Sequence, residues 1–359
     1  MSFESFTPLA GIIGGSLIGG SAGVLLLMNG DIMGISGILS NTLADPIASL
    51  KNPKHHWRWV FLGSFAMTVN VYVNYLTPDV ALQDSRSTDT DVPIPSFIGH
   101  LLGGFLVGVG TKIGNGCTTG HGICGLGRLS PRSLFAVCTF TGTSIITRYL
   151  TSPLRSWSIL TDILHKSTLP TASPLASALV MGSLALPALV APAVDSTKSL
   201  GAALSGIMFA AGLAVSGMTK NSKVHDFLCF SNFWEHKYDP TLMAVMGSGI
   251  LSSWLSYQFI KGYGNFGTGT LTCPLKGSGD FSGVPTNRTI DARLMMGAMV
   301  FGVGWGLTGI CPGPGIYAAA AGIIDAIVGW IPAFLVGSLV GKKIVQEVWE
   351  TKPAVKKEQ

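Results

Sequence analysis

Long apolar stretches with almost no charged residues are the feature that most constrains how this chain can fold. The first of them, residues 9–28, contains no Asp, Glu, Lys or Arg. Charged residues make up 11% of the 359-residue sequence, whereas soluble domains contain about 25%, and the mean hydropathy is +0.48. About twenty apolar residues cross a bilayer as an α-helix. We therefore predict an all-α polytopic membrane protein with nine spans, at residues 9–28, 59–77, 96–113, 133–150, 174–194, 200–217, 240–260, 291–307 and 323–341.

Glycine is abundant in these stretches, and the sequence contains 47 glycines in total. Gly15, Gly19 and Gly23 recur every four residues, a spacing that lets two membrane helices approach closely. Several of the predicted spans are short and interrupted by glycine, which is typical of transporter cores.

The charges of the loops predict an orientation, because cytoplasmic loops carry an excess of Lys and Arg. The 44–58 loop is basic and the 78–95 loop is acidic, while Lys342 and Lys343 follow the last span. We predict an N-terminus outside and a C-terminus inside, most simply in the cell membrane. The basic 148–170 loop does not fit this bias.

Two segments of the chain resemble each other. Residues 105–120 (FLVGVGTKIGNGCTTG) match residues 299–314 (MVFGVGWGLTGICPGP), and aligning Cys117 with Cys311 also pairs two glycines of each segment. A weaker match joins residues 34–39 (GISGIL) with 214–219 (AVSGMT).

Four spans, one extra span and four further spans would give the two halves opposite orientations in the membrane. Inverted repeats of this kind place a substrate site near the midplane, often on broken helices. The predicted division is a first repeat at 9–150, a linking segment with the extra span at 151–199, a second repeat at 200–345 and a charged tail at 346–359.

The sequence GNGCTTGHGICGLGRLSPRS (114–133) places thiols and glycines at a predicted helix break. Irregular backbone at membrane depth lies against protein or a wet cavity, where free N–H groups and a helix N-terminus bind anions. The thiols of Cys117 and Cys124 are weak S–H donors that suit a soft sulfur atom. Cys311 repeats the arrangement, followed by Pro312, which has no N–H.

Each candidate also has a structural interpretation. A buried cysteine is usually a small apolar residue, and we interpret Cys138 in this way. His121 has the alternative role of hydrogen-bonding a carbonyl, and Cys117, His121 and Cys124 have the alternative role of metal ligands. Lys112 either faces the pathway and attracts an anion, or extends to the membrane interface.

Motifs for catalysis and energy coupling are absent from the sequence. It contains no Walker A loop, no Ser-His-Asp pattern and no HExxH motif, so we expect no enzymatic activity and no cofactor or resident metal. The six cysteines lack disulfide spacing and are expected to be free thiols. The net charge of +5 gives no support for nucleic-acid binding.

The 114–133 motif and GLTGICPGPG (306–315) together resemble the YeeE/YedE family of sulfur-transport proteins, over about residues 9–345. This resemblance implies an hourglass fold of two inverted halves that takes up thiosulfate or a related sulfur species. It also implies pathway cysteines that hydrogen-bond the terminal sulfur of thiosulfate, roles that fall on Cys117 and Cys311 here. Lys112 matches a position that is often basic in the family. Where some members have another cysteine, this chain has Met33 or its neighbours, and Met33 is expected to line the pathway as a soft group that donates no hydrogen bond.

We therefore expect a membrane transporter for thiosulfate or a related inorganic sulfur compound. Its expected partners are that anion, the lipid bilayer and a cytoplasmic sulfur-accepting protein, but no nucleic acid. Alternative functions are covalent sulfur transfer through a Cys117 persulfide, which needs an activated thiolate, and a small-anion channel or structural membrane protein. The expected pathway residues are Cys117, Cys311, Cys124, His121, Lys112, Gly116, Thr118, Pro312 and Gly313.

Overall fold

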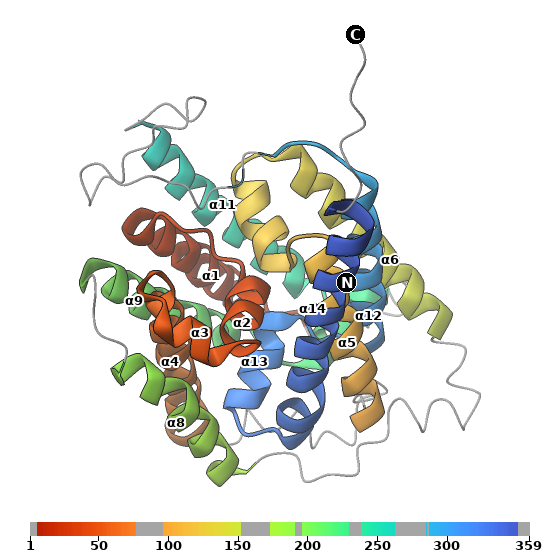
Figure 1. Cartoon of the computed structure of the whole chain (residues 1–359). Coiled ribbons are helices and arrows are strands. Elements are labelled where there is room, and N and C mark those ends of the chain that lie inside the picture. The colour runs from red at the N-terminus through yellow and green to blue at the C-terminus, as the bar shows by residue number, and fades with distance from the viewer. Residues whose placement is uncertain are drawn as a thin grey trace.

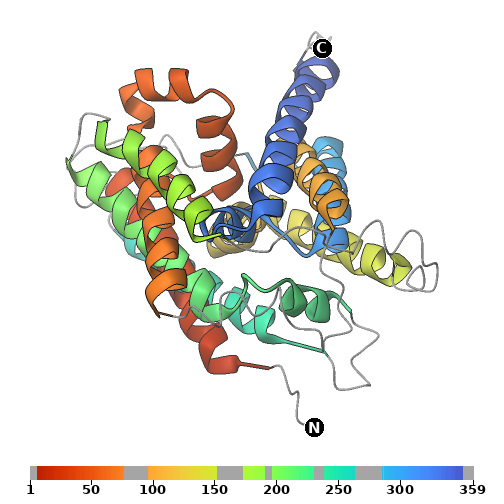
Figure 2. The same ribbon diagram turned by 90° about the horizontal axis from the view of Figure 1, so that it is seen from below.

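The computed structural model describes residues 6–76, 96–151, 173–190, 196–229, 238–262, 285 and 287–350, and throughout these ranges the chain is helical, without β-strands. Figures 1 and 2 show the arrangement from two sides. The longer helices are α1 (Pro8–Asn29), α4 (His56–Val71), α5 (Phe97–Ile113), α6 (Pro131–Thr151), α8 (Pro174–Val190), α9 (Ser196–Ser216), α11 (Thr241–Gly262), α12 (Ala292–Thr308) and α14 (Ile331–Val345). The shorter helices are α2 (Ile35–Leu43), α3 (Pro46–Lys51), η1 (Pro53–His55), η2 (Tyr72–Leu76), η4 (Thr118–Gly125), α10 (Asn221–Leu228), α13 (Pro312–Ala320), η7 (Asp325–Trp330) and η8 (Gln346–Glu350).

All nine apolar ranges predicted from the sequence fall on helices in their described parts. By length and hydropathy, three helical segments in the described chain could cross a membrane, namely Pro8–Asn29, Ser196–Ser216 and Asp325–Glu350. The count rises to five if each of two bent helix pairs forms one span. The 78–95 loop and most of the 148–170 and 261–289 loops lie outside the described residues.

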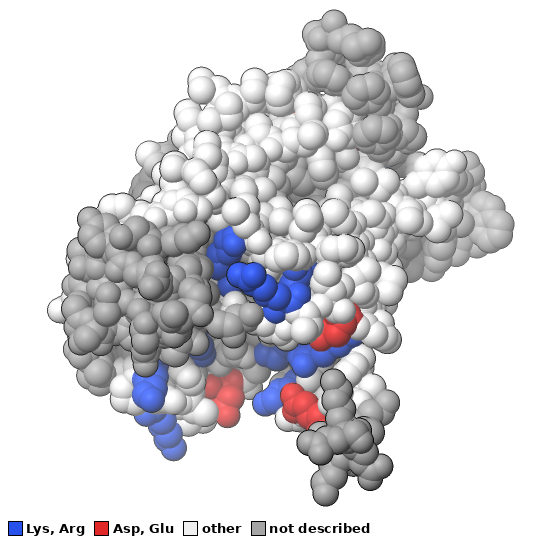
Figure 3. Space-filling model, turned by 90° about the horizontal axis from the view of Figure 1, so that it is seen from above, with Lys and Arg blue, Asp and Glu red and all other residues white. Residues whose placement is uncertain are grey.

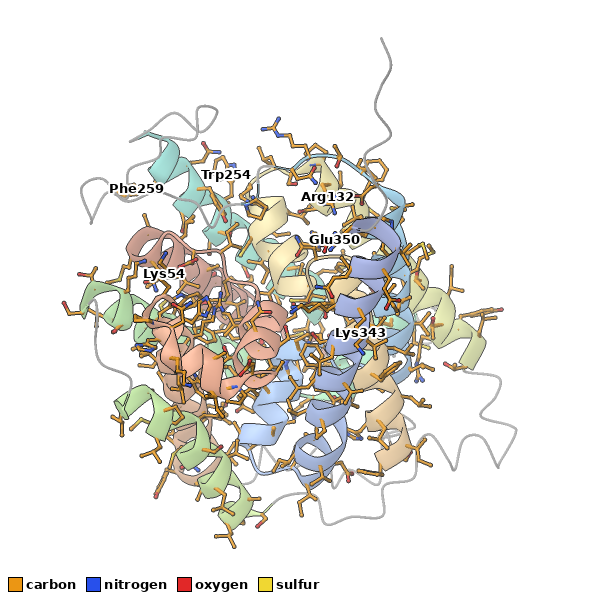
Figure 4. All side chains as sticks on the ribbon, viewed as in Figure 1. Lys54, Arg132, Trp254, Phe259, Lys343 and Glu350 are labelled. Atoms are coloured by element: carbon orange, nitrogen blue, oxygen red, sulfur yellow. The ribbon has the colours of Figure 1, made fainter. Side chains whose placement is uncertain are left out.

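The long helices form two groups on either side of the short helix α13 (Figure 1). In one group α1 packs between α9 and α11, and α4 packs between α8 and α9. Gly15, Gly19 and Gly23 mediate helix packing, as the sequence predicts. All three lie directly against α11 with no room for a side chain. At the far end of α11, Phe259 points away from the body of the protein (Figure 4) and is 53% exposed.

The second group contains α5, α6, α12 and α14, with α5 and α12 at its centre. Gly108 of α5 packs against the backbone of Phe334, and Gly302 of α12 packs against the backbone of Phe140. Aligning Cys117 with Cys311 pairs these two glycines and also these two phenylalanines. The sequence repeat is therefore accompanied by a repeated packing arrangement.

Both repeat segments break at the same place, as the sequence predicts. The pair α5 and η4 is bent by 48°, and the pair α12 and α13 by 44°. A residue with left-handed backbone follows each long helix, Asn115 with φ 58° in one and Gly309 with φ 69° in the other. The two cysteines are then the N-cap residues of the short helices that follow.

The weaker pairing of residues 34–39 with 214–219 is wrong. Ser36 and Gly37 lie inside α2, whereas Gly217 ends α9 with φ 69°. Gly30, which ends α1 with φ 73°, has the same backbone role as Gly217. The short Ser-Gly match was misleading because the two dipeptides have different backbone roles.

Candidate functional site

Cys117 lies at the centre of the first helix break. Its backbone is extended (φ −126°, ψ −172°), and its carbonyl accepts a hydrogen bond from the His121 N–H at 2.8 Å, which starts helix η4. The residue is only 1% exposed. The break therefore holds the thiol at a fixed position inside the protein.

His121 fixes the shape of this break. Its Nε2 lies 3.2 Å from the carbonyl oxygen of Gly114, and its Nδ1 lies 3.2 Å from Oγ of Ser133. A carbonyl only accepts hydrogen bonds, so Nε2 carries the proton and Nδ1 accepts from the hydroxyl. The interpretation that His121 hydrogen-bonds a carbonyl is confirmed. Gly116 lies beneath the ring, where an added Cβ would be 2.6 Å from Nε2 of His121.

A polar cavity of about 480 Å³, which we call the vestibule, opens beside the break. Figure 3 shows Lys and Arg side chains gathered around a hollow on one face of the molecule. The charged residues that line the vestibule are Arg58, Lys112, Arg128, Arg132, Arg293, Asp31 and Asp291. Gly116, Gly120 and His121 line it where it meets the break. The vestibule thus presents an excess of positive charge next to the backbone around Cys117.

Lys112 lines the vestibule. Its Nζ donates to Oδ1 of Asn41 at 2.8 Å and to Oγ of Ser40 at 3.4 Å, both on α2. The two partners are neutral, so the charge of Lys112 is not neutralised by these bonds.

Two basic residues after η4, Arg128 and Arg132, also line the vestibule. Arg128 donates to the carbonyl of Pro285 at 2.8 Å. Arg132, at the start of α6 (Figure 4), donates to the Thr289 carbonyl and forms an ion pair with Asp291 at 3.3 Å. Both arginines therefore lie in the cavity wall.

Arg293 is a vestibule residue that the sequence analysis missed. Its Nε donates to the carbonyl of Ile113 at 3.0 Å, at the C-terminal end of α5. The sequence did contain a signal for this residue, because Arg293 is a charged residue at the very start of a predicted span, and charged residues in spans face cavities or partners. Arg58 was assigned only to a basic loop, although it lies in α4 and lines the same cavity.

Cys124 and Met33 meet behind the break. The Cys124 thiol donates to the Met33 carbonyl at 3.5 Å, and Ser21 donates to the Met33 sulfur at 3.5 Å. Met33 is fully buried and Cys124 is 1% exposed. Met33 lines neither the vestibule nor the apolar cavity on the other side of the break.

That apolar cavity, of about 300 Å³, is bordered by Thr118 at the break and by aromatic and aliphatic residues. Phe209, Leu213 and Trp305 form part of its wall, together with residues of α10. Cys311 and Gly313 also line it. Cys311 is the N-cap of α13, and its carbonyl accepts from the Gly315 N–H at 2.9 Å, while Pro312 is the first residue of the helix.

The break therefore separates two unlike cavities. Gly116 lines the vestibule and Thr118 lines the apolar cavity, so Cys117 lies between them. In the part of the chain that the structure describes, Cys117, Cys124, Cys138 and Cys311 are free thiols, and no cluster of three His, Cys, Asp or Glu side chains is suited to a metal.

Apolar helices that break around buried thiols, with a basic cavity on one side, define a membrane transporter. Comparison with known proteins supports the assignment as a membrane transporter. Residues 82–146 match the family model described as sulphur transport, and residues 198–357 match a family of unknown function, DUF6691. One probable transporter of Xylella fastidiosa (strain Temecula1) is 30% identical over 141 residues, 39% of this chain and 86% of the relative. A second from that strain is 38% identical over 129 residues, 36% of this chain and 84% of the relative.

The chain belongs to the YeeE/YedE family of sulfur-transport proteins. A probable transporter from a second strain of Xylella fastidiosa, 9a5c, is 37% identical over 129 residues and is covered to 84% of its length. These relatives are each less than half as long as this chain, since alignment over most of their length covers only 36–39% of it.

Proposed function

We propose that this protein takes up thiosulfate or a related inorganic sulfur anion, and that Cys117 receives the sulfur end of the substrate. The observation that carries the proposal is the place of Cys117 between a basic vestibule and an apolar cavity. A sulfur anion has charged oxygens that suit the cations of the vestibule and a soft sulfur that suits a thiol donor. A transport role needs no bond making, so the protein acts without catalysis.

The vestibule acts on the substrate through its charge. Lys112, Arg58 and Arg293 hold the anion in the vestibule, where a cavity with low-dielectric walls strengthens their field. At the break, the N-terminal end of η4 adds N–H donors and partial positive charge to the site. The Cys117 S–H then replaces part of the hydration that the sulfur end loses.

On the side of Cys117 away from the vestibule, the pathway leads to Cys311. Thr118, which follows Cys117, and Cys311 line the same apolar cavity, so the substrate sulfur is handed from one thiol to the next. Cys124 lies behind the break and supports the position of Cys117. The remaining wall is apolar and acts as the closed gate of the pathway, because a dry constriction excludes a hydrated anion.

The two halves form inverted repeats of four spans each, joined by a ninth span, with the boundaries 9–150, 151–199 and 200–345. This architecture is supported by the matching bends of α5–η4 and α12–α13 and by the repeated glycine packing. α8 is the extra span, and its Ser177 donates to the carbonyl of Ala320 at 2.7 Å.

We assign the N-terminus to the outside of the cell membrane and the C-terminus to the inside. α1 begins at the N-terminus and ends beside Asp31 in the vestibule, and Gly341 near the end of α14 packs against Lys112. The vestibule therefore opens to the cytoplasm and the structure is the inward-open state. A cytoplasmic sulfur-accepting protein would collect the anion there.

Orientation is tested with an impermeant maleimide in intact cells. Asp45 lies before α3 on the vestibule side and Tyr75 lies at the opposite end of α4, and both are exposed. We expect Tyr75→Cys to react in intact cells and Asp45→Cys to react only after permeabilisation, with the unsubstituted protein as the background. The opposite pattern would reverse the orientation and make the vestibule the entrance.

Function is tested by growth of a transport-deficient host on thiosulfate as the sole sulfur source, followed by uptake of radiolabelled thiosulfate into proteoliposomes. We expect saturable uptake that other sulfur anions inhibit. Non-saturable flux would indicate a channel, and no flux would contradict the proposal. Covalent transfer would add the mass of one sulfur atom to Cys117, which intact-protein mass spectrometry detects.

A further inference from the structure

Asp31 places a negative charge inside a cavity that otherwise favours anions. α1 ends at Asn29, and Gly30 adopts a left-handed backbone (φ 73°), which turns the chain so that Asp31 begins the extended link to α2. The half-buried Asp31 lines the vestibule together with Arg58 and Lys112. No step of the uptake pathway requires an acid at this position.

The surroundings of Asp31 are basic on every described side. Lys198 at the start of α9, Arg58 of α4 and His55 of η1 are the charged or titratable groups that face it. The Asn29 side chain holds the Lys198 backbone in place through a 3.1 Å bond to its carbonyl. Among the described residues, none of these nitrogens approaches the Asp31 carboxylate within the 4.0 Å of an ion pair.

Asp291, the other acid in the vestibule, differs in this respect. Its carboxylate pairs with Arg132 at 3.3 Å and accepts the Leu294 N–H at 2.9 Å, which caps α12. The charge of Asp291 is therefore part of the cavity wall. Among the described residues no ion pair engages the Asp31 carboxylate, so its protonation can change without breaking an ion pair of the described cavity wall.

Burial raises the pKa of Asp31, and the neighbouring Lys198, Arg58 and His55 partly oppose this effect. A bound anion would add negative charge to the cavity and favour the protonated acid further. His55 is less suited to this role, because burial and the nearby Arg58 lower its pKa and so disfavour its protonation. Binding of an anion and binding of a proton are then linked, and each strengthens the other.

The geometry points to Asp31 as the residue that couples anion binding in the vestibule to the uptake of one proton. This inference rests on the proposed function, since it assigns the co-substrate of the same site. The proton adds to the carboxylate and leaves again when the anion departs, so one negative charge is removed from the cavity for each anion bound. Transport would then respond to a proton gradient.

The test is isothermal titration of the purified full-length protein with thiosulfate, at about pH 8 and about pH 5.5, in pairs of buffers with different ionisation enthalpies. We expect uptake of up to about one proton per bound anion, and over the pH range in which the proton is taken up the binding should tighten about tenfold for each unit by which the pH falls. Thiosulfate itself stays fully ionised over this range.

The decisive variant is Asp31→Asn, which removes the charge and keeps the shape. We expect no proton uptake and an affinity at about pH 8 that matches the wild type at the lower pH. Asp45→Asn, an exposed acid that caps α3, removes the same charge elsewhere and should behave as the wild type. His55→Gln should retain the proton uptake.

The outcomes separate the two proposals. Thiosulfate binding without proton uptake, or equal proton uptake by wild type and Asp31→Asn, would overturn the role of Asp31 and leave the anion site intact. No binding of thiosulfate to the folded wild type at either pH would overturn the proposed function, and the coupling with it.

Discussion

The two helix breaks have the same backbone plan and opposite surroundings. Each follows a long helix of 17 residues, contains a left-handed residue and presents a cysteine as the N-cap of the next helix. The first break is held by the polar contacts of His121 and borders the basic vestibule. The second is followed directly by Pro312 and borders the apolar cavity.

This difference indicates that the two breaks have different roles in transport. The first break borders the vestibule through Gly116 and Gly120, so the backbone beside the buried Cys117 thiol faces the charged side. Proline at the start of α13 fixes the backbone and removes an N–H, so the second break offers its thiol in a setting that excludes water. We infer that the first break binds and the second one gates.

The largest effect is expected for Cys117→Ala. A hydrogen bond to a charged group contributes about 1.5–3 kcal/mol, which corresponds to roughly a 10- to 150-fold loss of thiosulfate uptake. The matched control is Cys138→Ala. The expectation that Cys138 is a buried packing residue is wrong, because it is exposed on α6, and its substitution should be silent. Uptake at the wild-type rate by a normally expressed Cys117→Ala variant would remove the first break from the pathway.

Lys112→Met tests whether the positive charge of the vestibule beside the first break acts on the substrate. Methionine keeps the apolar volume but removes the charge, so apparent affinity for thiosulfate should fall about tenfold, while Lys112→Arg should retain most of it. Concentration-dependent uptake by the three proteins at equal expression provides the measurement. Equal affinity of wild type and Lys112→Met would show that this charge does not act on the substrate.

Gly116→Ala and Gly313→Ala compare the packing of the two breaks directly. A Cβ at Gly116 would lie 2.6 Å from the His121 ring, whereas one at Gly313 would lie 3.3 Å from Phe209. We expect a loss of about 1–3 kcal/mol in stability for the first and a much smaller change for the second. Thermal unfolding of the detergent-solubilised variants measures the difference, and equal melting temperatures would contradict the tethering role of His121.

Pro312→Ala should have the smallest effect. Alanine fits the first turn of a helix, and the loss of proline costs about 0.5–1 kcal/mol, chiefly by enlarging the freedom of the unfolded chain. Thermal unfolding should therefore show a small decrease, with uptake retained. A collapse of uptake at unchanged stability would mean that the missing N–H itself matters for the gate.

Sequence patterns predicted the elements of this fold but not the cavity between them. The nine apolar ranges, the two breaks and the free thiols follow from local composition and from one internal match. The vestibule combines side chains from distant segments, such as Asp31, Arg58 and Arg293, and no local pattern reports which of them converge. Short amphipathic pieces such as α10 also escaped notice, because eight residues carry little periodic signal.

Met33 illustrates the limit of reasoning by position. Its place in the sequence suggested a soft group lining the pathway, yet the turn at Gly30 directs it into the core, where Ser21 and Cys124 contact it. The neighbouring Ile32 and Gly34 line the vestibule instead. In an extended segment, alternate residues face opposite directions, so a shift of one residue changes the environment completely.

The central claim is that the Cys117 thiol receives the sulfur end of the anion without forming a bond to it. Cryo-electron microscopy of the protein in lipid nanodiscs with thiosulfate tests this most directly. The account predicts a separate anion at the inner end of the vestibule, with its oxygens toward Lys112 and its terminal sulfur within hydrogen-bonding distance of Sγ of Cys117. A persulfide on Cys117, or an anion bound away from both cysteines, would contradict it.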